Sequence, residues 1–174
     1  MKKILLVLAA FGLILGMSGL AAAADITTFN VTALIEAACV VGTTENMAFG
    51  SLALLDADGK VVTTGYDDAT ATFYQACTTG TTGATLAFAG SAGSGFAMTG
   101  AGGSPDTIAY TLFSNSSRTT GITKATPALG STFSGFAADG VDHQITVYGR
   151  IALASMVAKK VDTYSDTVTV TVSY

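Results

Sequence analysis

The sequence predicts an all-β protein built as a single β-sandwich domain. Charged residues make up only 11% of the 174 residues, whereas threonine, a β-branched residue that favours strands, occurs 27 times. Beyond residue 24, short alternating segments are separated by glycine-rich loops, which is typical of a sandwich. The only weak helical candidate is 153–160. A hydrophobic content of 49% excludes intrinsic disorder, and an isoelectric point near 4.6 argues against nucleic-acid binding.

Residues 1–24 are expected to be a secretory signal peptide. Lys2 and Lys3 precede an apolar stretch, and Ala22-Ala23-Ala24 gives an A-x-A cleavage pattern before Asp25. The mature chain would then hold 6 basic and 12 acidic residues, because two of the eight basic residues leave with the signal. We therefore expect an exported protein.

Cys39 and Cys77 are the only cysteines of the chain. Export places them in an oxidising compartment, where a lone pair of cysteines favours a disulfide. A loop of this size stabilises a fold by roughly 4 kcal/mol on the chain-entropy model.

The first expected strand covers 28–37. Its residues alternate, so that Phe29, Val31, Ala33 and Ile35 fall on one face. An amphipathic first strand is ordinary in a sandwich, and the pattern alone does not say which domain buries this face.

Later strands follow in order along the chain. The expected segments are 69–77, 83–90, 107–114, 143–153 and 164–174. The last of these places Val168, Val170, Val172 and Tyr174 on one face. If it is the sixth strand of a seven-strand sandwich, one strand is missing and an apolar groove lies open, which is an aggregation hazard unless something fills it.

Five blocks of the chain resemble, in this order, the spore coat U domain proteins, which are subunits of archaic (Csu-type) chaperone–usher pili. The resemblance covers nearly all of 25–174. The blocks are ITTFNVTALIEAACVV (26–41), NMAFGSLAL (46–54), TIAYTLFSNSSRTT (107–120), ITVYGRI (145–151) and YSDTVTVTVSY (164–174).

The resemblance implies an incomplete immunoglobulin-like β-sandwich that is completed by a donor strand from a neighbouring subunit. It divides the chain into a signal peptide (1–24), a donor strand (25–36) and a pilin domain (37–174). Phe29, Val31, Ala33 and Ile35 would be the donor plugs, and Val168, Val170, Val172 and Tyr174 the edge of the acceptor groove. The Cys39–Cys77 disulfide would tie the first strand of the domain to the second.

The implied partners are copies of itself or related pilins, a periplasmic chaperone and an outer-membrane usher, with no nucleic acid. The chain would pass through the periplasm to a cell-surface pilus and serve adhesion and biofilm formation. The sequence does not decide between a major, minor or tip subunit.

We find no catalytic or metal-binding motif, and we expect neither an enzyme nor a cofactor. Asp56-Ala57-Asp58-Gly59 begins like a calcium loop but lacks the later ligands. Ser91 lies in a near miss to a nucleophile elbow without the strand–turn–helix context, and His143 is the single histidine.

Two other hypotheses stay open. A self-contained secreted β-sandwich could bind a ligand such as a glycan through Tyr66, Tyr74, Tyr110 or Tyr148, and it would pack 28–37 on its own domain. An envelope or spore coat structural protein is the second, and neighbouring chaperone and usher genes would argue against it.

Overall fold

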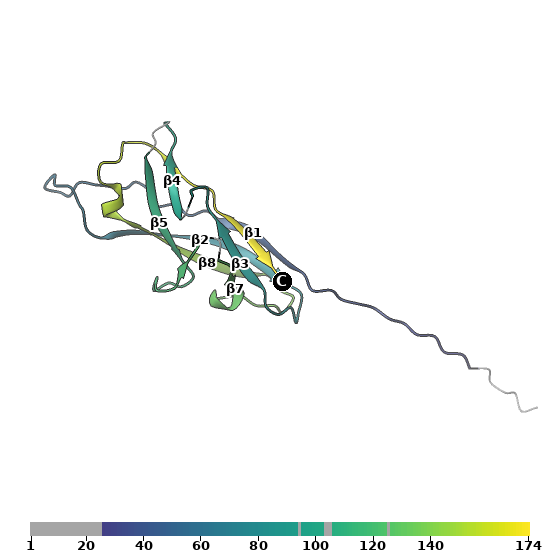
Figure 1. Cartoon of the computed structure of the whole chain (residues 1–174). Helices are drawn as coiled ribbons and strands as arrows, with labels where there is room; N and C mark the ends of the chain where they lie inside the picture. Colours follow the sequence, from purple (N-terminus) through teal and green to yellow (C-terminus); the bar gives the residue numbers. More distant parts are fainter. Residues whose placement is uncertain (1–25, 94, 103–105, 125) are drawn as a thin grey trace, which may run out of the picture. The chain divides into compact units, whose positions relative to one another are not determined.

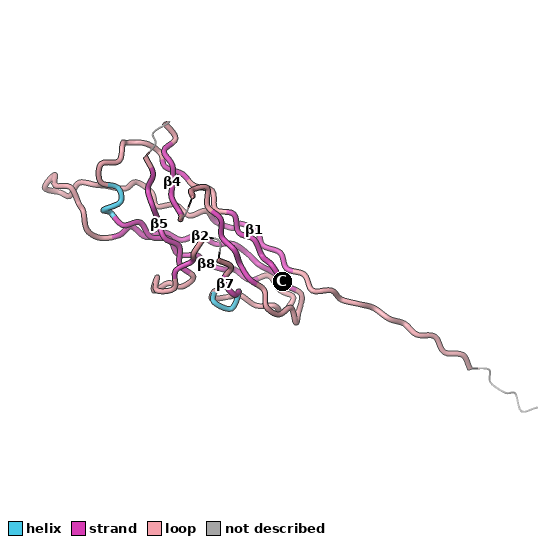
Figure 2. The backbone as a smooth tube through the Cα atoms, in the orientation of Figure 1, coloured by secondary structure: helices cyan, strands magenta, loops and turns pink. Residues whose placement is uncertain are grey.

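The computed structural model describes residues 26–93, 95–102, 106–124 and 126–174. The chain divides into two units, Met1–Leu34 and Ile35–Tyr174. All strands belong to the second unit (Figure 2), and no α-helix is found among the described residues. The signal peptide expected at 1–24 lies outside the described residues.

The larger sheet has seven strands in the order β1-β2-β8-β5-β4-β9, with β6 beside β5. Figure 1 labels β1, β2, β8, β5 and β4 of this sheet. Neighbouring strands are antiparallel throughout. Its strands are β1 (Cys39–Glu45), β2 (Tyr66–Cys77), β4 (Phe96–Gly100), β5 (Thr107–Phe113), β6 (Gly121–Ile122), β8 (His143–Ala152) and β9 (Tyr164–Ser165).

The smaller sheet has three antiparallel strands in the order β10-β3-β7. These are β3 (Thr85–Ala89), β7 (Ala128–Leu129) and β10 (Thr169–Ser173), and two short 3₁₀ turns, η1 (Gly130–Thr132) and η2 (Leu153–Met156), complete the element list.

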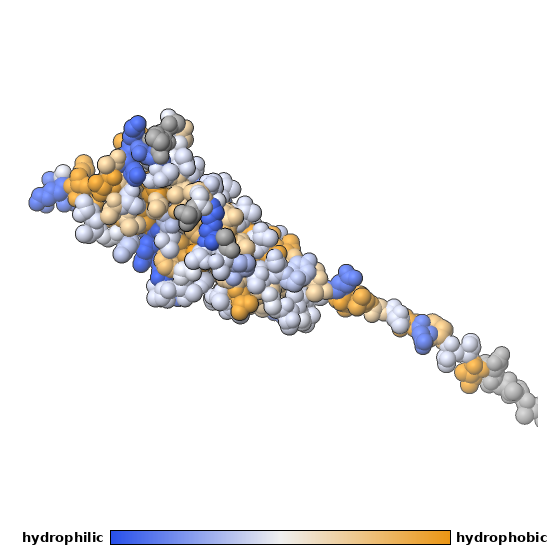
Figure 3. Space-filling model, in the orientation of Figure 1, coloured by the Kyte–Doolittle hydropathy of each residue, from blue (hydrophilic) through white to orange (hydrophobic). Residues whose placement is uncertain are grey.

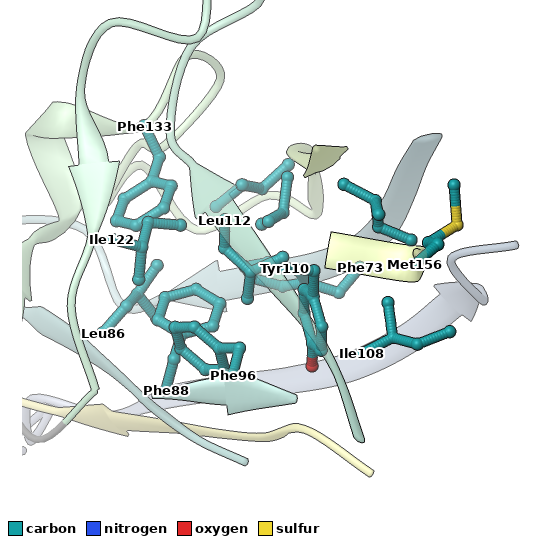
Figure 4. Packing of buried hydrophobic residues seen from close by; sticks show 13 residues of the cluster. Phe73, Leu86, Phe88, Phe96, Ile108, Tyr110, Leu112, Ile122, Phe133 and Met156 are labelled. Carbon is teal, nitrogen blue, oxygen red and sulfur yellow. The ribbon is translucent and has the colours of Figure 1, made fainter. Parts of the chain in front are cut away.

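The core lies between the two sheets. Every second residue of β5 and β8 is buried, which is the period expected of strands with one inner face. Phe73 of the larger sheet and Phe88 of the smaller one meet edge to face with ring centroids 6.4 Å apart. Phe88, Phe96 and Tyr110 gather at the centre of this cluster (Figure 4). The sandwich predicted from the sequence is therefore confirmed.

Several boundaries differ from the expectation. The final strand is not continuous, because Asp166, Thr167 and Val168 separate β9 from β10. The weak helical candidate at 153–160 forms only η2. Phe96–Gly100, which we did not single out, forms β4, since its alternation is short and lies between two glycine-rich loops.

The expected strand at 28–37 forms no ladder with any described residue. Its members are extended but unpaired, and Phe29 and Val31 are each 84% exposed. The alternation therefore shows which face of the segment is apolar, but within the described residues it does not correspond to a paired strand.

Gly149 of β8 marks a close approach in the core. A Cβ there would overlap Met47 Sδ and lie 2.9 Å from the Phe49 ring. We predict that Gly149→Ala lowers the free energy of unfolding by about 1–3 kcal/mol, because it forces both side chains to move. Gly121→Ala is the matched control, since nothing lies within 4 Å of the Cβ it would add. Denaturant titration of both variants measures the difference, and equal stabilities would contradict this packing.

Candidate functional site: a groove between two edge strands

Two of the strands at the sheet edges, β1 and β10, border the same opening of the sandwich, and each has only one described partner. Within the described part of the chain, β1 pairs only with β2 and β10 pairs only with β3. The two lie beside each other without forming a ladder (Figure 1). Each therefore has a row of backbone N–H and C=O groups that no strand of its own domain satisfies.

A cavity of about 530 Å³ opens between these edges. One wall is the end of β1 with the segment after it, including Glu45, Met47 and Phe49, and the other wall is the C-terminal segment 164–168 with Val170. The floor consists of core side chains. These are Phe73, Phe88, Met98, Tyr110, Leu112 and Val147. The inner layer of the sandwich is thus reachable from the side, through a mainly apolar groove.

Asp166 holds the C-terminal wall in place. Its Oδ2 accepts a hydrogen bond from Tyr110 Oη at 2.7 Å, and its Oδ1 accepts one from the Ser91 backbone N–H at 2.9 Å. The Ser91 hydroxyl and the Thr167 backbone N–H also donate to Oδ1. One carboxylate therefore ties the segment between β9 and β10 to β5 and to the loop after β3.

The protonation of this pair follows from its surroundings. Burial alone would raise the pKa of Asp166, but the hydrogen bonds from Ser91, Tyr110 and the Thr167 backbone outweigh it, and the pKa lies below its ordinary value. Burial, followed by the hydrogen bond to Asp166, raises the pKa of Tyr110 far above its ordinary value. Asp166 is therefore a carboxylate, and Tyr110 stays a neutral donor.

The groove lies close to some residues of the predicted acceptor edge and not to others. Val168 and Val170 line the cavity. Val172 packs against the core outside it, and Tyr174 is 59% exposed. Cys39 and Cys77 form the expected disulfide between β1 and β2.

Sequence reasoning missed the other wall of the groove. Met47 and Phe49 alternate in NMAFG, so a period-two signal was present but short. Asp166 interrupts the apolar face of YSDTVTVTV, and a carboxylate at an inward position is the signal of a hydrogen-bonded staple. Met98 and Tyr110 belong to strands whose partners only the tertiary fold defines.

The segment before the domain exposes a row of apolar side chains. Among the described residues 26–34 of the first unit, Phe29 and Val31 are exposed, and Ile35 at the start of the second unit is 83% exposed. Apolar atoms recur along this segment in Figure 3. Ala33 shares their face, whereas Leu34, 82% exposed, lies on the other.

A family model, the Spore Coat Protein U domain, matches residues 25–171. The chain belongs to the spore coat protein U domain family. The match includes both the exposed segment and the groove, so the two are parts of one family unit. Membership indicates a structural protein rather than an enzyme.

A solved structure resembles this spore coat protein U domain. It is a chain of the CsuC–CsuE chaperone–tip adhesion subunit pre-assembly complex from archaic chaperone–usher Csu pili of Acinetobacter baumannii. The identity is 16% and the TM-score 0.51, and the match covers 80% of this chain but only 40% of the other. At this identity the likeness concerns the fold. No curated protein sequence matches the chain.

Two further observations complete the description of the spore coat protein U domain. Across the described ranges, no group of three or more histidine, cysteine, aspartate or glutamate side chains could hold a metal ion. Within the same ranges, no helix has the length and apolar character needed to cross a membrane.

The Asp166 staple predicts an acid-sensitive domain. A carboxylate with a lowered folded-state pKa stabilises the fold above its unfolded pKa of about 3.9, and the contribution is lost as pH falls through the folded value. We expect Asp166→Asn to lower stability at neutral pH and to flatten the loss of stability below about pH 4. Urea titrations from neutral to acid pH measure this, with Asp142→Asn as a control at an exposed position. The same acid dependence in Asp166→Asn and the parent would contradict the staple.

Proposed function

We propose that this chain is a structural subunit of an archaic chaperone–usher pilus that polymerises by donor-strand exchange. One observation carries the proposal: the same chain holds an unfilled groove between two edge strands and an unpaired segment with alternating apolar side chains. Strand addition joins such surfaces, since backbone hydrogen bonds give affinity and alternate side chains give specificity. In this role residues 25–36 are the donor strand and 37–174 the pilin domain.

The energetics favour a long-lived contact. Burying Phe29, Val31 and Ile35 contributes about 1.5–3 kcal/mol each, or roughly 5–9 kcal/mol before the cost of ordering the segment. Each backbone hydrogen bond to β1 or β10 adds about 0.5–1.5 kcal/mol. Donor and groove lie on different surfaces of one chain, so the contact is heterologous and grows as an open fibre.

The ends of the edge strands favour one polarity. β10 ends near the point where β1 begins at Cys39 (Figure 1), whereas the cavity lies at the other end of these two strands. A donor antiparallel to β10 has its C-terminal end at the cavity, and the domain of the neighbour, which follows that end of the donor, lies beyond the cavity end of the groove. In this arrangement Ile35 faces the cavity beside Val168 and Val170.

The partners follow from the role. A periplasmic chaperone covers the groove before assembly, an outer-membrane usher exports the subunit, and copies of the chain or related pilins form the fibre at the cell surface. The solved relative was crystallised as a complex of a chaperone with a tip adhesion subunit, which supports the first partner. Surface adhesion and biofilm formation are the proposed biological outcome.

A self-contained β-sandwich predicts that 28–37 packs on its own domain. The exposure of Phe29, Val31 and Ile35 favours the fibre instead. For an envelope or spore coat protein, chaperone and usher genes beside this gene remain the discriminating observation.

Substitution on the two faces of the donor segment tests the plug assignment. We expect Ile35→Asp to abolish fibre growth, because a carboxylate cannot be buried unpaired in an apolar groove. Leu34→Asp introduces the same charge one residue earlier on the other face, and it should leave fibres intact. Sedimentation and negative-stain microscopy of both mature variants measure polymer. Fibres of Ile35→Asp as abundant as those of Leu34→Asp would overturn the assignment.

A rearranged chain tests whether the segment is a transferable strand. We expect that moving 25–37 behind Tyr174 through a flexible linker gives a monomer that melts at a higher temperature than the parent, since the groove is filled in cis. Size-exclusion chromatography and thermal unfolding give the two readouts. A parent that is itself a stable monomer, together with a less stable rearranged chain, would show that the segment belongs to its own domain.

A further inference from the structure

The outer face of the larger sheet carries a cluster of polar side chains that does not line the groove. Outward side chains stand in register across three strands: Asp68 of β2 is opposite Arg150 of β8, which is opposite Thr111 of β5. The next outward pair toward the end of β8 is Tyr66 and Ala152. Core residues alternate with these on the other face. This surface is therefore separated from the groove by the thickness of the sheet.

A cavity of about 330 Å³ lies on this face. Ala109 and Ala152 are small outward residues, and they leave a depression beside the bulkier Tyr66 and Phe113. Thr111, Arg150 and Ser155 supply the polar side chains of the lining, whereas Tyr110, which also borders the depression, has its side chain on the core side of β5. The depression thus combines the rings of Tyr66 and Phe113, the guanidinium of Arg150 and the hydroxyl groups of Thr111 and Ser155, and its volume lies within the range of small-ligand sites.

Arg150 is held in one orientation. Its Nε donates to Asp68 Oδ1 at 2.7 Å and its Nη2 donates to Oδ2 at 2.9 Å, and its guanidinium carbon lies 4.6 Å from the centroid of the Tyr66 ring. Such a bidentate, stacked arginine loses little further entropy when it binds a ligand. Its Nη1 has no hydrogen-bond partner within the described parts of the chain, so this edge is free to donate.

The cluster has an excess of positive charge. Arg118 Nε lies 3.3 Å from the same Asp68 Oδ1, so one carboxylate is shared by two guanidiniums. Asp67, the next acidic residue, belongs to the other face of β2. A local charge of about +1 within a chain of net charge −4 favours an anionic group at this point.

We infer that this depression binds a uronate unit of an acidic polysaccharide, with the carboxylate on Arg150, the pyranose ring against Tyr66, and sugar hydroxyls on Thr111 and Ser155. Ser155 Oγ donates to the Ala152 carbonyl at 2.7 Å, so its lone pairs can accept a sugar hydroxyl. A neutral sugar would not form an ion pair with Arg150. A peptide carboxylate would form that ion pair but would not form hydrogen bonds with the hydroxyl groups of Thr111 and Ser155. The site goes beyond the proposed role in a fibre and does not depend on it.

Equilibrium dialysis with labelled trigalacturonate tests this site, because the method works for single chains and for fibres alike. We expect saturable binding by the mature chain at millimolar or lower concentration, weakened by salt. Arg150→Gln removes the charged donor, and Ala109→Leu fills the depression without changing any charge. Each should weaken binding by about tenfold or more, Arg150→Gln because one charge-assisted contact is lost and Ala109→Leu because the added side chain occupies the space of the sugar. Lys159→Gln, with the same charge change outside the cluster, should bind as the parent does.

Three results would overturn the inference. They are no saturable binding by the parent, unchanged affinity in Ala109→Leu, and displacement of the label by cellotriose or hippurate as effective as by unlabelled trigalacturonate. Leucine at the outward position 109 disturbs no buried contact, so this variant keeps the test decisive even if Arg150→Gln unfolds. Circular dichroism of each variant separates loss of binding from loss of fold.

Discussion

The main constraint on this structure is that β1 and β10 lie beside each other without forming hydrogen bonds as a ladder. β1 and β10 each lack a second neighbour, and the side chains that a further strand would cover line a groove into the core. A sandwich with this defect exposes both apolar surface and unpaired backbone groups, which are the two features that drive strands to associate. Beside this groove, the Asp166 carboxylate ties the segment between β9 and β10 to the rest of the domain, and the apolar segment before the domain is unpaired.

The sequence predicted the strands with long alternation, and it missed β4. β2, β5 and β8 have seven or more residues, and their period of two survives local irregularity. β4 has five residues between glycine-rich loops and gives too little signal. For 28–37 the alternation is strong but unpaired, since periodicity reports which face is apolar and not which chain buries it.

The residues of the candidate groove could also be predicted only in part. Val168 and Val170 were predictable because they belong to a strongly alternating strand, whereas Tyr174 extends past the cavity. Met47, Met98 and Tyr110 come from three distant segments, and only tertiary packing brings them to one cavity. Of the tyrosines that the sequence suggested for glycan binding, Tyr110 points into the core, whereas Tyr66 lies on the surface and is 63% exposed.

The disulfide has a mechanical consequence in the proposed fibre. Tension along the fibre enters each domain through the donor segment at Cys39, the first residue of β1. A force applied at this point would break the hydrogen bonds between β1 and β2 one after another, beginning at Cys39. The Cys39–Cys77 bond joins this point covalently to the end of β2, a strand that is paired on both sides. The load therefore bypasses the weakest edge of the sheet and is spread over its interior.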